Sequence, residues 1–205
     1  MNTRRNAYGY YRVTLQKSDG TMLVQSNTER AFIVTQLQYL LSPRLILGEI
    51  PAYRQLASCI DLLSFSIKSD TVELLLFSID KGIARYLADQ IVEHFEQYQT
   101  ELRPSALRNH RLGTAVTLRT LTGPHDALAT SVLIHLRHED WEYDRYSSIG
   151  FYLHDRRGDW MRTWRLSQLY ENKPDQYLEL IHSKLHKSLF ATRDASHYFA
   201  QSQHK

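Results

Sequence analysis

A short stretch in the second half of the chain combines arginine and tryptophan at close spacing. Residues 154–165, HDRRGDWMRTWR, contain Arg156, Arg157, Trp160, Arg162, Trp164 and Arg165. Guanidinium groups bind phosphates in a bidentate manner, and indole rings stack on unpaired bases. The stretch therefore predicts contact with single-stranded DNA or with a hairpin loop. Trp164 precedes an amphipathic run and is expected in the core, whereas Trp160 suits either a core role or base stacking.

A second basic segment runs over residues 103–112. It carries Arg103, Arg108 and Arg111, and Pro104 interrupts any helix at this point. Loops carry a large share of binding residues because their side chains face solvent. We therefore expect these three arginines to contact phosphate as well.

Two histidine pairs have spacings that could suit a metal. His135 and His138 are three residues apart, with Glu139 next to them, and His182 and His186 are four residues apart. Residues three or four apart share a helix face. We nevertheless interpret both pairs as structural or solvated groups, because helix-end histidines commonly cap and lysines alternate with the second pair.

Composition limits the class of protein. The 205 residues are 42% hydrophobic and 23% charged, which is typical of a globular chain and excludes disordered, collagen-like and coiled-coil proteins. A single cysteine, Cys59, excludes an intramolecular disulfide framework and a thiolate zinc site. No apolar run reaches the length of a membrane helix, and the start, MNTRRNAYGYYR, has no apolar signal core. We expect a cytoplasmic protein without membrane contact.

Positive charge is concentrated in the second half of the chain. Residues 1–102 contain 10 basic and 11 acidic residues, whereas residues 103–205 contain 15 basic and 11 acidic residues, most of the basic ones arginine. This asymmetry favours a polyanionic partner, although an ordinary solvated surface would show the same balance.

Hydrophobic periodicity predicts the elements that must position these residues. The first half gives the order strand, helix, strand, strand, helix, over residues 8–15, 26–43, 60–67, 72–79 and 81–101. This order is the core of a split βαβ arrangement, an α+β fold with an antiparallel sheet and helices on one face. Residues 115–121 could form a strand or an extended lead-in. Helices are expected over 126–136, 147–153, 164–170 and 175–189, so we predict a core over 1–122 and a helical C-terminal appendage over 123–205 packed on it.

Several segments resemble one family in the same order along the chain. The paired strands IDLLSFSIKSDTVELLL at 60–76, the segment LIHL at 133–136, the box DRYSS at 144–148, and Trp160 followed by QYL at 176–178 resemble the REP-associated tyrosine transposases, a subgroup of the single-tyrosine HUH transposases. The resemblance covers most of the chain. It implies a ferredoxin-like, HUH transposase-like sheet and an activity that cuts single-stranded DNA with a tyrosine hydroxyl and a divalent metal.

The residues at the family's metal position depart from its pattern. In the frame of the family's two histidines, separated by one residue, this sequence has Thr71 and Glu73. A strand turns residues i and i+2 to the same face, which explains the family's spacing. Glu73 could still take one coordination position on a hard ion, with Asp70 and Thr71 as weak partners. The resemblance therefore implies a degenerate metal site at Glu73, Asp70 and Thr71.

The family's nucleophile has two possible counterparts here. The helix after the hairpin contains FEQYQ at 95–99, so the position holds either Phe95, without a hydroxyl, or Tyr98. Tyr98 is the candidate catalytic residue.

Three functions follow from these patterns. The preferred one is a transposase-like protein that binds single-stranded or hairpin DNA and no longer cuts the strand. Such a protein needs no cofactor and could form a homodimer. The second is an active nickase with Mg²⁺ or Mn²⁺ at Glu73 and Tyr98 as nucleophile. The third is a protein-interaction module on a former transposase fold.

Overall fold

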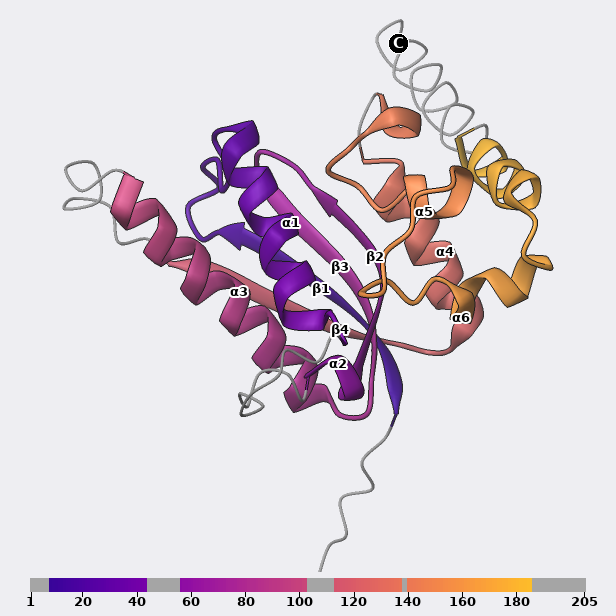
Figure 1. Ribbon diagram of the computed structural model, residues 1–205, viewed down its shortest axis with the longest axis horizontal. Helices are drawn as coiled ribbons and strands as arrows, with labels where there is room; N and C mark the ends of the chain where they lie inside the picture. Colours follow the sequence, from indigo (N-terminus) through magenta and orange to yellow (C-terminus); the bar gives the residue numbers. More distant parts are fainter. Residues whose placement is uncertain (1–7, 44–55, 103–112, 138–139, 186–205) are drawn as a thin grey trace, which may run out of the picture.

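A four-stranded antiparallel sheet organises the fold, which is of the α+β class (Figure 1). The computed structural model describes residues 8–43, 56–102, 113–137 and 140–185. The strand order is β2-β3-β1-β4, and the strands are β1 (Gly9–Lys17), β2 (Ile60–Ile67), β3 (Thr71–Ser78) and β4 (Thr114–Leu121). All three neighbouring pairs are antiparallel. The expectation of an α+β fold with an antiparallel sheet is therefore confirmed, and residues 114–121 form a strand.

Helices α1 (Asn27–Leu41) and α3 (Lys81–Leu102) cover one face of the sheet, and the short α2 (Leu56–Cys59) leads into β2. Ser26 caps α1 by accepting a hydrogen bond from the Glu29 backbone N–H, which satisfies one of the free donors of its first turn. The apolar sides of both helices pack on alternate residues of the strands, such as Val13, Val72 and Leu74. We name this cluster the α1/α3 core.

The segments after β4 cover the opposite face (Figure 1). They comprise α4 (Pro124–His135), η2 (Trp141–Tyr143), α5 (Gly150–Leu153), α6 (Trp164–Ser167), η3 (Gln168–Tyr170) and a helical stretch over 174–185. Leu63 and Leu75 of the sheet pack against them. Strands β2 and β3 are thus buried on both faces, which explains their nearly continuous apolar sequences. Among the described helices, none has the length and apolar character that crossing a bilayer requires.

An irregularity in β2 decides which of its side chains face α4. The register with β3 shifts between Leu62 and Ser64, so Leu63 is an extra residue in the strand. Before the shift, Leu62 packs in the α1/α3 core, and after it Phe65 does so. Because of this bulge, Ser64 and Ser66 face α4 instead of the α1/α3 core.

Two later segments of the chain, around residues 146–148 and at residue 162, form backbone hydrogen bonds with the outer edge of β2. Ile67 N–H donates to the Tyr146 carbonyl at 3.0 Å, Ser148 N–H donates to the Phe65 carbonyl at 2.9 Å, and Arg162 N–H donates to the Leu62 carbonyl at 2.9 Å. These bonds fix the loop around residue 146 beside the β2–β3 hairpin.

Candidate functional site

Glu73 lies on β3 at the face of the sheet beneath α4. Its neighbours Val72 and Leu74 belong to the α1/α3 core, so the alternation of the strand turns Glu73 to the opposite face. It pairs in register with Thr14 on β1 and Ser66 on β2. Its side chain is only 3% exposed, and a carboxylate buried to this extent requires charged or hydrogen-bonding partners.

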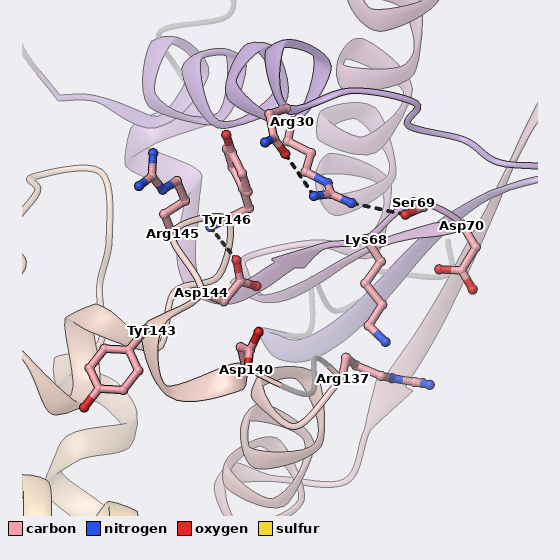
Figure 2. Close-up of a pocket in the computed structure, with 11 residues that line it drawn as sticks. Arg30, Lys68, Ser69, Asp70, Arg137, Asp140, Tyr143, Asp144, Arg145 and Tyr146 are labelled. Atoms are coloured by element: carbon pink, nitrogen blue, oxygen red, sulfur yellow. Dashed lines mark hydrogen bonds between the residues drawn. The ribbon is translucent and has the colours of Figure 1, made fainter.

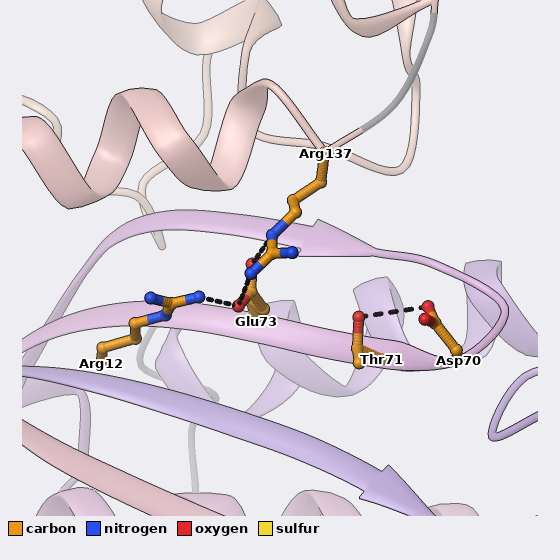
Figure 3. Close-up of polar contacts among 5 residues, drawn as sticks. All are labelled: Arg12, Asp70, Thr71, Glu73 and Arg137. Atoms are coloured by element: carbon orange, nitrogen blue, oxygen red, sulfur yellow. Dashed lines mark hydrogen bonds and ion pairs between the residues drawn. The ribbon is translucent and has the colours of Figure 1, made fainter. Parts of the chain in front are cut away.

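Two arginines supply these partners (Figure 3). Arg12 on β1 donates to Oε1 of Glu73. Arg137, directly after α4, donates from Nε to Oε2 at 3.0 Å and from Nη2 to Oε1 at 3.2 Å. Both carboxylate oxygens are therefore bound by guanidinium groups. The three side chains carry one net positive charge, so the cluster attracts an anion more readily than a cation.

The residues at this position do not fit a divalent metal. Mg²⁺ requires carboxylate and water oxygens free to coordinate it, whereas two positive guanidinium groups bind both oxygens of Glu73. Thr71 shares its face of β3 but directs its hydroxyl to Asp70 Oδ1 at 3.3 Å (Figure 3). In the described ranges, no three His, Cys, Asp or Glu side chains are grouped so that they could hold a metal ion.

Tyr98 lies on the other side of the sheet from Glu73. It projects from α3 and stacks on Phe32 of α1, with ring centroids 4.0 Å apart and planes 10° apart. The two rings line a small groove together with His94, which hydrogen-bonds Gln36 at 2.8 Å. The structure therefore does not bring Tyr98 and Glu73 into one site.

The arginines of the predicted DNA-binding segments have different surroundings. Arg103, Arg108 and Arg111 lie outside the described residues. Arg157 is exposed. Arg156 is half-buried and donates to the carbonyls of Arg145 and Ser147 at 3.2 and 3.3 Å, which supports the loop beside β2.

Arg162 and Arg165 converge on one carboxylate of β2. Arg165 Nε donates to Asp61, and Arg162 Nε lies 3.8 Å from the same side chain. The Arg165 guanidinium also lies 3.9 Å from the centre of the Phe77 ring. These arginines attach the C-terminal segment to the sheet, so a phosphate would have to compete with Asp61 for them.

The two tryptophans have different environments, and only that of Trp164 contradicts the expectation. Trp160 is 6% exposed and packs between Phe65 and Phe151, at 5.6 Å from each ring centroid, so its indole presents no open face to a base. Trp164 is 48% exposed, so its expected place in the core is wrong. Leu166 and Tyr170 fill the core at this point, and Arg165 lies over the Trp164 ring at 4.6 Å.

A cleft of about 900 Å³ opens at the end of the β2–β3 hairpin (Figure 2). Three segments distant in sequence form it: the start of α1, the hairpin turn and the chain between α4 and α5. It is lined by Asn27, Arg30, Lys68, Ser69, Asp70, Arg137, Asp140, Tyr143, Asp144, Arg145 and Tyr146. The cleft therefore combines four cationic side chains with three carboxylates and two phenol rings.

The cations of the cleft differ in how they are held. Arg30 donates to Ser69 at 3.1 Å and Asn27 at 3.0 Å. Arg137 is bound to Glu73 but remains 49% exposed. Within the described part of the chain, no side-chain partner binds the Lys68 ammonium or the Arg145 guanidinium. Lys68 and Arg145 are thus available to a ligand, while Arg30 and Arg137 are pre-positioned.

The amino-acid sequence alone does not predict this cleft. Lys68 and Arg145 lie within the segments that carry the resemblance, but no sequence pattern assigns them to DNA binding. No pattern singles out Arg30 or Arg137 either. Lys68, a basic residue in the predicted hairpin turn, was the available sequence signal for a binding site. Which loop lies beside that turn is shown only by the hydrogen bonds along the edge of β2.

A buried hydrogen-bond network lies behind the cleft. His135 at the end of α4 is fully buried, with Nδ1 2.7 Å from the Tyr177 hydroxyl and Nε2 2.6 Å from Ser148 Oγ. Ser131 links Tyr177 at 2.8 Å to Ser64 of β2. Burial lowers the pKa of His135 to about 3, so the imidazole is neutral at physiological pH. Its complete burial supports the structural interpretation of His135.

Comparisons with known protein families and with curated sequences do not identify a family for this chain. The chain matches no model of a known protein family, and no curated protein sequence matches it.

Proposed function

We propose that this protein binds single-stranded or hairpin DNA on a ferredoxin-like, HUH transposase-like core that does not cut the strand. Apart from the short α2 before β2, the element order is β1-α1-β2-β3-α3-β4. This order and the sheet order β2-β3-β1-β4 support the fold, because they are those of the split βαβ arrangement. A homodimer and a cytoplasmic location are parts of the same proposal.

The observation that carries the proposal is the cleft, in which four cationic side chains outnumber three carboxylates. Lys68 and Arg145 approach it from the hairpin turn and from the loop before α5 (Figure 2). Glu73 holds Arg137 at the cleft, and Arg12 balances the charge of that carboxylate. Backbone phosphates are the ligands that such groups bind, by charge and by hydrogen bonds.

The affinity for a hairpin oligonucleotide should fall steeply with salt. Each phosphate neutralised by a cation releases condensed counterions, so the slope of log K against log salt is about −0.7 per contact on a single strand. Lys68→Ala and Arg145→Ala should each weaken binding and reduce that slope by about 0.7. Fluorescence anisotropy across a salt series measures both quantities.

Lys81→Ala is the matched control, because it removes an exposed lysine from the first turn of α3, outside the cleft. Its slope and affinity should equal those of the parent. An equal loss in all three variants would indicate a general charge effect and count against the cleft. Absence of binding at low salt would favour the protein-interaction alternative.

Incubation with a hairpin oligonucleotide and Mn²⁺ should leave no covalent protein–DNA adduct on a denaturing gel. A phosphotyrosine requires the tyrosine and the activated phosphate in one site, and the structure separates Tyr98 from Glu73 by the sheet. Tyr98→Phe should behave like the parent. An adduct that this substitution abolishes would support the active-nickase alternative.

A further inference from the structure

Tyr143 occupies an unusual position for an aromatic side chain. It ends η2 and is 78% exposed, although aromatic rings ordinarily bury most of their surface. The other strongly exposed aromatic residues in the described part of the chain are Tyr8, Tyr39, Tyr86 and Trp164. Of the five, Tyr143 alone lines the cleft at the β2–β3 hairpin.

His154 holds the Tyr143 ring from one side. The two rings are 5.9 Å apart between centroids, with planes 15° apart. His154 follows α5, and its Nε2 lies 3.3 Å from the Glu142 carbonyl, so the contact joins two separate segments of the chain. One face of the phenol ring thus meets His154, while the high exposure of Tyr143 leaves surface open to a ligand.

The cleft places Tyr143 apart from two of its cations. Figure 2 shows Tyr143 across the cleft from Lys68 and Arg137, with Arg145 on the same side as Tyr143. A nucleotide strand likewise presents its charged phosphates and its flat aromatic bases at separate positions. Base-on-aromatic stacking contributes about 1–3 kcal/mol per base and is available only to a base that is not already stacked in a duplex.

We infer that Tyr143 is the stacking platform for an unpaired base of the bound strand, so the cleft selects single-stranded DNA or a hairpin loop over duplex DNA. This inference rests on the proposed function. Lys68 and Arg145 contact the backbone of either form, and Tyr143 adds affinity only for the form that offers a free base.

The test compares a labelled hairpin that has an unpaired loop with a blunt duplex of the same stem sequence. Tyr143→Ala should weaken hairpin binding by about 5- to 150-fold, which corresponds to the stacking energy, and should leave duplex binding unchanged. Tyr143→Phe should retain the parent affinity because the ring remains. Tyr86→Ala, which removes an exposed tyrosine from α3, should change neither affinity.

The outcomes separate this inference from the proposed function. If the parent binds neither oligonucleotide at low salt, the proposed function fails. If the parent binds the hairpin and Tyr143→Ala binds it equally well, the stacking role is wrong and DNA binding stands. An equal loss of hairpin and duplex binding would also overturn the stacking role, since a phosphate contact gives that result.

Discussion

Replacing Glu73 with alanine is expected to lower the free energy of unfolding by about 3–5 kcal/mol. The substitution leaves two guanidinium groups facing each other without their shared carboxylate. Arg137 can turn to water because it is 49% exposed, but Arg12 is only 21% exposed and its Nε already has no partner among the described residues. The cost therefore comes mainly from the uncompensated charge of Arg12. Urea unfolding followed by tryptophan fluorescence measures it.

Two further variants make this result specific to the ion cluster. Asp70→Ala removes an exposed carboxylate at the hairpin turn and should change stability by no more than about 0.5 kcal/mol. Glu73→Ala combined with Arg12→Ala should cost about 0.5–3 kcal/mol less than the two single changes added together, because the double variant contains no unpaired Arg12. Additive losses, or a loss in Glu73→Ala as small as in Asp70→Ala, would show that the cluster does not stabilise the fold.

Acidification should destabilise the protein through His135. Its pKa falls from 6.5 to about 3 on folding, so between these values the unfolded state binds a proton that the folded state does not. The contribution of neutral His135 to stability is therefore complete above about pH 6.5 and is lost as the pH falls towards 3. The slope from this group is about 1.4 kcal/mol per pH unit.

The comparison with His135→Leu isolates this effect from all other titrating groups. The variant should be less stable than the parent at pH 8, because Tyr177 and Ser148 lose a partner, yet its stability should fall less steeply below pH 6.5. His125→Gln changes an exposed histidine on the same helix and should keep the parent's slope. Parallel curves for the parent and His135→Leu would mean that His135 does not supply the acid sensitivity.

The sequence predicted the sheet well because its strands carry strong local signals. The apolar runs at 60–67 and 72–79 and the short turn between them determine a hairpin without information from elsewhere in the chain. The spacing of Thr71 and Glu73 likewise predicts a shared face of one strand, and the structure has that arrangement. Which charges meet Glu73 could not be predicted, because Arg12 and Arg137 come from segments 61 and 64 residues away.

The tryptophans show the limit of helical periodicity. Trp164 begins a run with helical spacing, but α6 is only four residues long and continues as η3, so the face that is buried shifts to Leu166 and Tyr170. Trp160 lies in a turn between α5 and α6, so it gives no periodic signal. Its burial depends on Phe65, whose direction is decided by the bulge at Leu63. A bulge changes every later residue of a strand and has no clear sequence signature here.

The His135 network has a consequence for shortening the chain. Tyr177 lies in the helical stretch over 174–185, and its hydroxyl hydrogen-bonds the buried side chains of Ser131 and His135 on α4. A chain that stopped before residue 177 would keep every strand but leave an imidazole nitrogen and a serine hydroxyl without this partner in an apolar interior. The last described helix is thus a cooperative part of the folding unit, and a minimal folded fragment must include it.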